Sequence, residues 1–266
     1  MVLLRMESFY EYCRVHSSSI DKIQAYYKTH EQNINKNDIF GWCCAQGYFD
    51  IVRWLYSLGG IDIHMDKDYA FRWSCIGGHL NIAQWLYTLG DVDIRAINEF
   101  TFRWSCVKGH LDIAQWLYSL GNIDIHMEND YPFVYSCAGG HLNVAQWLYS
   151  LGNINIHADN ETVFRTSCYY GHLNVAQWLY SLGNIDIHAI NDNAFRLSCI
   201  HGELNVAQWL YSLGDTSVSG KRNVDIHANN DEAFHYSCKY GHLNVVQWLT
   251  KICHTSIMLK LTQVEH

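Results

Sequence analysis

The sequence predicts an all-α solenoid built from short tandem helix-turn-helix repeats. A tryptophan recurs every 31 residues, with one step of 39: Trp54, Trp85, Trp116, Trp147, Trp178, Trp209 and Trp248. Two further columns keep the same phase: Phe40, Phe71, Phe102, Phe133, Phe164, Phe195 and Phe234, and Cys44, Cys75, Cys106, Cys137, Cys168, Cys199 and Cys238. Three columns with one period indicate repeats that bury their apolar faces against one another.

The columns divide the chain into three parts. Residues 40–250 hold seven repeats, and the extra eight residues of the long step fall near 216–223. Residues 1–39 are interpreted as a degenerate N-terminal capping repeat, because Phe9 and Cys13 keep the phase while Ile23 replaces the tryptophan. Such erosion is expected at the end of a stack, where one face meets water. Residues 251–266 form a short C-terminal tail.

A single repeat predicts two helices and an extended arm. The run from Ala70 to Gly77 is long enough for two helical turns, and Gly78 ends it. The following segment has apolar residues at i, i+3, i+4 and i+7, which is one face of a second helix: Ile82, Trp85, Leu86 and Leu89. Residues 61–63 and their equivalents alternate apolar and polar side chains over too few positions for a helix and suit an extended arm.

An acidic or amide residue stands three positions before each phenylalanine: Asn37, Asp68, Glu99, Asp130, Glu161, Asp192 and Asp231. Carboxylates at a helix start accept hydrogen bonds from its free amides and oppose its dipole. We therefore expect these residues to cap the first helix of their own repeat.

Composition limits the possible partners. The 266 residues carry a net charge of −8, which argues against a grip on nucleic-acid phosphates. No apolar run approaches the roughly 20 residues of a membrane span, and no export signal is visible. Seven of the ten cysteines hold one position per repeat, about 10 Å apart in a stack, which is too far for disulfides. We expect reduced thiols and a cytoplasmic protein.

The run from Ser74 to Gly90 resembles the ankyrin repeat, with Ser-Cys at its Ala-Ala pair, the Gly-His turn and the closing glycine. The resemblance covers roughly residues 40–250, although each unit has 31 residues against about 33 for the family. It implies a non-catalytic scaffold that binds a partner protein. The His-Leu-Asn-Val-Ala-Gln-Trp-Leu pattern resembles the tryptophan-rich ankyrin proteins that large DNA viruses of protists encode, which implies a host protein partner in the host cytosol.

Metal binding is the sharpest alternative. Five repeats place cysteine and histidine four apart: Cys75 and His79, Cys106 and His110, Cys137 and His141, Cys168 and His172, and Cys238 and His242. A glycine interrupts the helix between the two residues, and no repeat supplies the two ligand pairs of a closed zinc site. We expect the histidine to hydrogen-bond to the next repeat and the cysteine to act as a small apolar residue.

A second histidine column also predicts hydrogen bonding: His64, His126, His157, His188 and His227. Arg95 replaces it in one repeat, and an arginine retains a donor but does not bind metal. Phosphate-loop, Gly-x-Ser-x-Gly, His-Glu-x-x-His and Cys-x-x-Cys motifs are absent from the sequence. We therefore predict neither catalysis nor a cofactor, and no bound metal.

Recognition is expected at positions that vary between repeats. Residues just before the first helix-ending glycine line the groove that the resemblance implies: Lys108, Tyr169, Tyr170, His201, Lys239 and Tyr240. The arm tips add Tyr69, Phe100 and Tyr131, which alternatively pack onto their own helix. The insertion adds Lys221 and Arg222, unless that loop is a neutral insertion. We expect a monomer that binds a partially basic protein.

The tryptophans share the helical face of the apolar residues Ile82, Leu86 and Leu89, so we expect them to lie in the core and stabilise the stack, and not to form an aromatic ligand cage. Replacing an interior tryptophan with alanine costs roughly 3–5 kcal/mol. Trp147→Ala should therefore lower the midpoint of thermal unfolding more than Trp248→Ala, which lies near one end. Equal effects in a thermal unfolding experiment would contradict the stacked arrangement.

Overall fold

The computed structural model describes residues 2–214 and 223–264, and within these ranges every regular element is a helix. The chain forms two compact units, Met1–Asp124 and Ile125–His266. The predicted all-α helix-turn-helix class is confirmed. Most of the insertion, including Lys221 and Arg222, lies outside the described residues.

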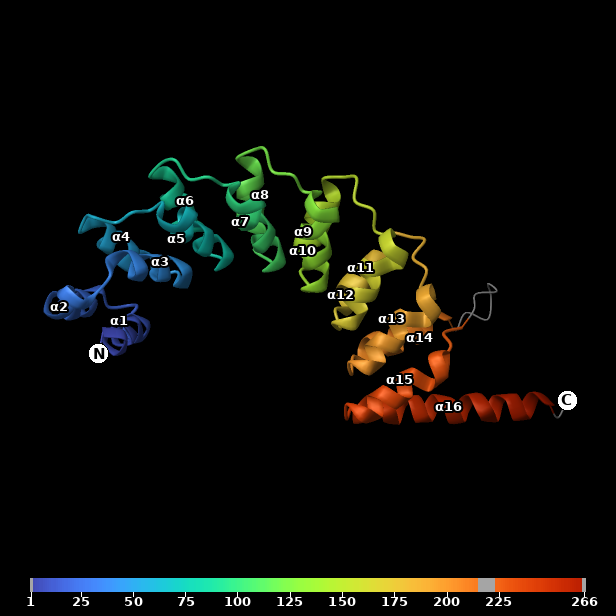
Figure 1. The fold of residues 1–266 in the computed structure, drawn as a ribbon. Helices are drawn as coiled ribbons and strands as arrows, with labels where there is room; N and C mark the ends of the chain where they lie inside the picture. Colours follow the sequence, from blue (N-terminus) through green and yellow to red (C-terminus); the bar gives the residue numbers. More distant parts are fainter. Residues whose placement is uncertain (1, 215–222, 265–266) are drawn as a thin grey trace. The chain divides into compact units, whose positions relative to one another are not determined.

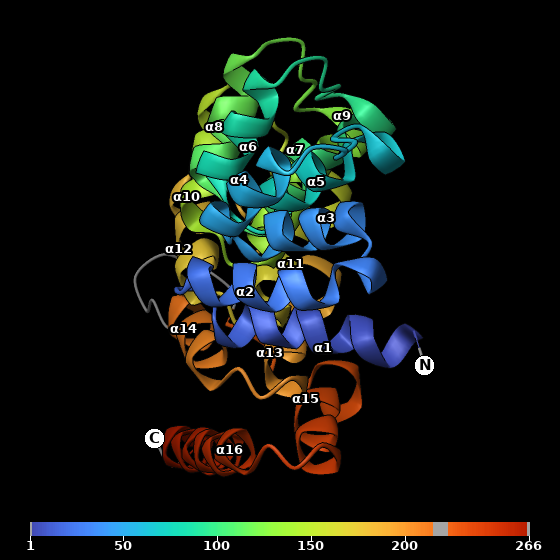
Figure 2. The ribbon, with the colours of Figure 1, turned by 90° about the vertical axis from the view of Figure 1, so that its left-hand side faces the viewer.

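The first unit begins with a helix pair and continues with three repeats. Its elements are α1 (Val2–Val15), α2 (Ile20–His30), a short 3₁₀ helix η1 (Glu31–Asn33), α3 (Lys36–Gln46), α4 (Phe49–Ser57), α5 (Met65–Ile76), α6 (Leu80–Thr88), α7 (Ala96–Val107) and α8 (Leu111–Ser119). Helix α5 packs against its partner α6 and against the neighbouring first helices α3 and α7. The first helices α3, α5 and α7 thus form one layer and the second helices α4, α6 and α8 another (Figures 1 and 2).

The second unit repeats the same arrangement. Its elements are α9 (Met127–Ala138), α10 (Leu142–Ser150), α11 (Ala158–Tyr169), α12 (Leu173–Ser181), α13 (Ala189–Ile200), α14 (Leu204–Gly214), α15 (Ala228–Lys239) and α16 (Leu243–Val264). The first helices α9, α11, α13 and α15 pack in succession, and each contacts the second helix that follows it. Residues 251–264, assigned to the tail by the sequence, continue helix α16.

A left-handed glycine ends each first helix from α3 to α15, and in five of them, at Gly47, Gly78, Gly140, Gly171 and Gly202, it also makes room for the next repeat. Gly78 has φ = 84°, and the amide of His79 donates to the Ser74 carbonyl at 2.9 Å, which closes the helix. A Cβ atom at Gly78 would lie 2.7 Å from the imidazole of His110 in the following repeat. Glycine is therefore required here both by the backbone conformation and by the close approach of the next repeat.

The core follows the phenylalanine and cysteine columns, as predicted. Phe71, Phe102, Phe133 and Phe164 are at most 1% exposed, and their cysteine partners are fully buried. The second helices α4, α6, α8, α10, α12 and α14 each add three buried residues, such as Ile82, Ala83 and Leu86 in α6. Phe9, Cys13 and Ile23, the equivalents in residues 1–39, are also buried. In the last repeat the equivalent Phe234 is 38% exposed.

The tryptophans are half-buried at the seams between repeats, whereas the sequence placed them in the core. Five of these indoles meet the tyrosine of the preceding second helix edge-on: Trp85 and Tyr56 at 5.2 Å, Trp116 and Tyr87 at 5.7 Å, Trp178 and Tyr149 at 5.7 Å, Trp209 and Tyr180 at 5.8 Å, and Trp248 and Tyr211 at 5.7 Å between ring centroids. Edge-to-face pairs add about 0.5–1.5 kcal/mol beyond area burial. The tryptophan column therefore stabilises the junctions between repeats.

The arm tips form left-handed turns that the sequence did not predict. Three consecutive residues have positive φ in α5, α9, α11, α13 and α15: 66–68, 128–130, 159–161, 190–192 and 229–231. Asparagine and aspartate adopt this conformation readily, whereas it is unfavourable for the β-branched Ile190, which nevertheless adopts it. An arginine on the same first helix bonds the turn: Arg72 donates to the carbonyls of Lys67 and Asp66 at 2.7 and 2.6 Å. Arg165 and Arg196 do the same in the second unit.

The acidic column links neighbouring repeats, so its predicted capping role is wrong. Helix α5 has no side-chain cap. Instead, the Asp68 carboxylate accepts the amide of Asp93 in the next repeat at 3.2 Å and the Nδ1 atom of His64 at 2.7 Å. The same amide contact recurs from Asp62 to Asn37, Asp124 to Glu99, Asp186 to Glu161 and Asp225 to Asp192. The second histidine column therefore holds the carboxylates, which confirms its predicted hydrogen-bonding role.

The turn histidines bond to the preceding repeat, whereas the sequence analysis expected the next one. The Nε2 atoms of His79, His110 and His172 lie 3.1, 2.9 and 2.9 Å from the carbonyls of Ala45, Ile76 and Ala138. Each histidine points toward the preceding repeat because the left-handed glycine there has no side chain and leaves space for the imidazole ring, as Gly47 does for His79. Glu203 replaces this histidine and lies over Gly171, but an ionised carboxylate has no proton to donate.

Glu203→His should strengthen this junction. A histidine restores a donor for the Tyr169 carbonyl, and one such bond raises the free energy of unfolding by about 1 kcal/mol. Urea denaturation measures the change. Glu203→Ala is the matched control, since it removes the carboxylate without adding a donor, and an equal gain from both variants would contradict this explanation.

Candidate functional site

The predicted tip aromatics are half-buried against their own helices. The Tyr69 and Trp73 rings are 5.8 Å apart, the Phe100 and Trp104 rings 6.0 Å, and the Tyr131 and Tyr135 rings 4.1 Å, each pair being four residues apart on one helix. Their packing follows the alternative that the sequence left open. Among the second rings of these three pairs, two are exposed: Trp73 at 38% and Tyr135 at 45%.

These second rings belong to a column that the sequence analysis missed. It stands two residues after each phenylalanine and comprises Trp42, Trp73, Trp104, Tyr135, Thr166, Leu197 and Tyr236. Each member is four residues after a tip residue and four before a residue next to the glycine, so all three share one helical face. We call this surface the first-helix face. The i, i+4, i+8 spacing would have revealed it.

The candidates before the glycines gather in two groups in the second unit. The Tyr169 ring lies 3.9 Å from His201 and 4.6 Å from Tyr170 between centroids, and Tyr170 is 54% exposed. Tyr169 and Tyr170 line a pocket of about 220 Å³ together with Arg165, Thr166 and Leu197.

In the last repeat, the Lys239 ammonium lies 5.6 Å from the Tyr240 ring and 5.3 Å from the Tyr236 ring. Tyr240 is 54% exposed. In the first unit, Lys108 similarly lies 5.7 Å from the Trp104 ring. The predicted candidates therefore lie on or beside the first-helix face, except Lys221 and Arg222, which are outside the described residues.

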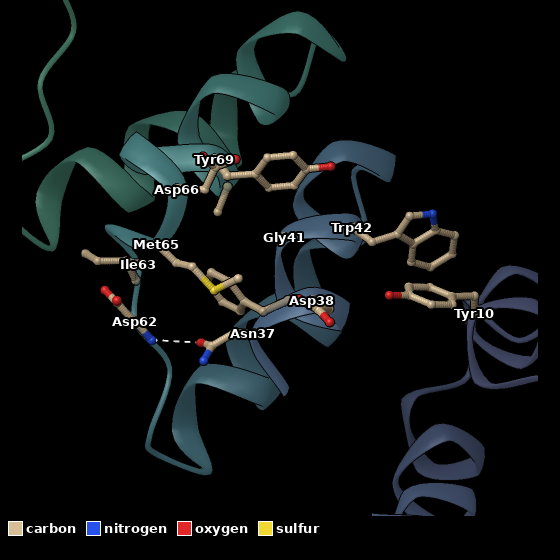
Figure 3. Close-up of a pocket in the computed structure, with 12 residues that line it drawn as sticks. Tyr10, Asn37, Asp38, Gly41, Trp42, Asp62, Ile63, Met65, Asp66 and Tyr69 are labelled. Atoms are coloured by element: carbon tan, nitrogen blue, oxygen red, sulfur yellow. Dashed lines mark hydrogen bonds between the residues drawn. The ribbon is translucent and has the colours of Figure 1, made fainter. Parts of the chain in front are cut away.

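A larger pocket of about 350 Å³ opens in the first unit between α1, α3 and the start of α5. Its lining comprises Tyr10, Asn37, Asp38, Phe40, Gly41, Trp42, Asp62, Ile63, Met65, Asp66, Tyr69 and Ala70. Figure 3 shows the Tyr69 ring reaching over Gly41 toward Trp42, with Tyr10 below the indole. The Tyr10 and Trp42 rings meet edge-on at 5.0 Å.

The pocket is acidic. Burial, and next the charge of Asp38, raise the pKa of the Tyr10 hydroxyl, which keeps it protonated. Asp66 lies 3.8 Å from Arg72, and Asp62 accepts the amide of His64 at 3.0 Å. Asp38 is half-buried and makes no side-chain hydrogen bond or ion pair with the described residues.

The cysteine and histidine of each repeat have separate roles in the structure. Cys75 is fully buried, and burial raises the pKa of its thiol far above the ordinary value, so the thiolate that binds metal is disfavoured. His79 directs Nε2 to a carbonyl. Groups of three or more potential metal ligands do not occur in the described part of the chain. Nor does any described helix have the length and apolar character of a membrane span.

Thiol alkylation of the native protein should be selective. Cys238 is exposed, whereas Cys75, Cys106, Cys137, Cys168 and Cys199 are buried with pKa values raised by desolvation. Iodoacetamide should therefore modify Cys238 at least about tenfold faster than these five, as mass spectrometry of the peptides would show. Equal labelling in the folded protein would contradict the buried cysteine column, and labelling in urea is the control.

Comparisons with known proteins agree with this architecture. The family model described as Ankyrin repeats (3 copies) matches residues 40–129 and 102–191. Among solved structures, the human ASB11 ankyrin repeat domain is similar with a TM-score of 0.52 and 16% identity, over 74% of this chain and 96% of that one, which supports the fold alone. A search of curated proteins found no match. Because the family model covers more than half of the sequence, the chain belongs to the ankyrin-repeat family.

Proposed function

We propose that this chain is a non-catalytic scaffold that binds a partner protein through the first-helix face and the adjoining arm turns. Ankyrin repeats generally mediate protein–protein interaction and are typically non-catalytic. The choice of the first-helix face as the binding surface rests on how sequence variation is distributed over the repeats.

Variation is concentrated on one layer. The second helices α10, α12 and α14 share the identical run Leu-Asn-Val-Ala-Gln-Trp-Leu-Tyr-Ser. The first helices α9, α11 and α13 keep the buried phenylalanine, serine and cysteine but differ at the first-helix face. A repeated framework that varies at exposed positions presents a surface specific to each repeat. This contrast is the single observation that carries the proposal.

The exposed side chains of this face suit protein recognition. Trp73, Tyr135, Tyr170 and Tyr240 expose between 38% and 54% of their surface. Large aromatic residues are enriched among the residues that contribute most to binding energy, because they bury much area at low entropic cost. Arg165 and Lys239 beside them add charged donors.

We further infer that the partner is a partially basic protein bound by a single copy of the chain. The net charge of −8 favours association with basic surfaces and disfavours nucleic acid. The buried column of reduced cysteines is consistent with the cytosol. The tryptophan-rich repeat pattern supports a viral-type protein with a host partner.

Partner capture with matched variants tests the proposed surface. Trp73→Ala on the first-helix face should weaken capture of the partner about tenfold or more, as expected for an aromatic residue that contributes strongly to binding. Tyr240→Ala tests the same face in the second unit. Quantitative mass spectrometry after affinity purification from the native host measures both.

Gln84→Ala is the control, because Gln84 is also exposed but lies on the second helix α6. It should leave capture unchanged, and thermal unfolding verifies that all variants are folded. Loss of the partner with Gln84→Ala, together with retention by both aromatic variants, would place the interface on the opposite layer and refute the proposal.

A further inference from the structure

We propose that the pocket of the first unit binds the guanidinium group of an arginine side chain on the partner protein. This inference rests on the proposed protein-binding function and specifies one contact within it. It follows from a comparison of equivalent positions in successive repeats, and from the walls and charge of the pocket.

An arginine follows the phenylalanine in several repeats and extends to the next repeat. Arg72 lies over the Phe100 ring, 5.6 Å from its centroid. Arg165 donates to the Asn193 amide oxygen at 2.9 Å, and Arg196 pairs with Glu232. In each junction the guanidinium thus meets the equivalent tip residue of the following repeat.

The junction between α3 and α5 lacks this arginine. Gly41 stands at the position of Arg72, and Tyr69 stands at the position of Phe100. A Cβ atom at Gly41 would lie 2.8 Å from the Tyr69 ring, so the ring occupies the space above the glycine. Among the lysine and arginine side chains that the structure describes, none lies over the Tyr69 or Trp42 ring. The pocket therefore opens where none of the described side chains supplies a cation.

The walls of the pocket suit a cation. Tyr10, Trp42 and Tyr69 supply aromatic rings, whose faces attract guanidinium and ammonium groups. On the same face of the first unit, two of the chain's own cations already lie over aromatic rings: Arg72 over Phe100 and Lys108 over Trp104. The volume of about 350 Å³ accommodates a complete side chain.

The negative charge of the pocket favours a positively charged ligand. Asp38 is half-buried beside Tyr10 and Trp42 and has no protein partner among the described residues. A partly desolvated carboxylate is stabilised by an opposite charge that also donates hydrogen bonds. Guanidinium fits better than ammonium, because it stacks on aromatic faces and can donate two parallel hydrogen bonds to one carboxylate.

Titration with small probes tests the pocket without the partner. N-acetyl-arginine methylamide should bind the full chain with a millimolar dissociation constant and shift the NMR signal of the Trp42 indole N–H. Trp42→Phe identifies that signal. N-acetyl-citrulline methylamide has the same shape without the charge and should produce no saturable shift. Lysine and trimethyllysine analogues should bind more weakly than the arginine analogue.

Asp38→Asn should weaken arginine binding about tenfold, since it removes a charge-assisted contact. Asp50→Asn is the matched control: it makes the same change on helix α4 of the same unit, outside the pocket, and should leave binding unchanged. Thermal unfolding checks that both variants are folded.

Four results would overturn the guanidinium assignment: no saturable shift with the arginine analogue, an equal response to the citrulline analogue, unaltered affinity in Asp38→Asn, or tighter binding of either lysine analogue. Because these probes do not involve the partner, their failure is distinguishable from failure of partner capture by the first-helix face.

Discussion

Side chains of one repeat satisfy backbone groups of its neighbour, and this interaction fixes the register of the stacked helices within each unit. The Asp68 carboxylate accepts an amide of the following repeat, while His79 bonds a carbonyl of the preceding one. Apolar contacts between helices are not directional and tolerate sliding. A buried amide or carbonyl left without its partner costs about 1–3 kcal/mol, which makes any other register unfavourable. The edge-on contacts of the tryptophans then add stability at a spacing already set by these hydrogen bonds.

Features that depend on local chain geometry could be predicted from the sequence. The phenylalanine and cysteine columns identify the buried face, and Gly78 marks the helix end, because periodicity and positive φ are properties of the segment itself. The hydrogen-bond partner of the Asp68 carboxylate could not be predicted in this way. Its partner amide is 25 residues away and approaches only after two repeats have packed. A local interpretation assigned the carboxylate to its own helix, where the structure has no such cap. The half-buried tryptophans were misplaced for a related reason, since their exposure depends on the neighbouring repeat.

The candidate site was only partly predictable because the arm tips are not open loops. Three successive left-handed residues turn the chain back, and Arg72 bonds their carbonyls from the same helix. The turn therefore brings Tyr69 into contact with Trp73 instead of projecting it into solvent. The Asn- and Asp-rich tips and an arginine five or six residues later are visible in the sequence, but nothing local indicates that they interact. Ile190 shows the strength of this constraint, because a β-branched residue adopts a left-handed conformation that is unfavourable for it in isolation.

The bonds that hold the repeats together also restrict where binding sites can develop. Residues that satisfy a neighbour's backbone, such as Asp68, cannot change without weakening a junction. Variation is therefore tolerated mainly on the first-helix face and at positions where one repeat departs from the shared pattern. Gly41 is such a departure: it replaces the arginine that bridges several later junctions, and it leaves a pocket in which Asp38 has no partner among the described residues. Glu203 is another, because a carboxylate replaces the histidine donor at an otherwise repeated contact. In a protein made of near-identical modules, individual departures of this kind distinguish one junction from the next and give a partner a defined place to bind.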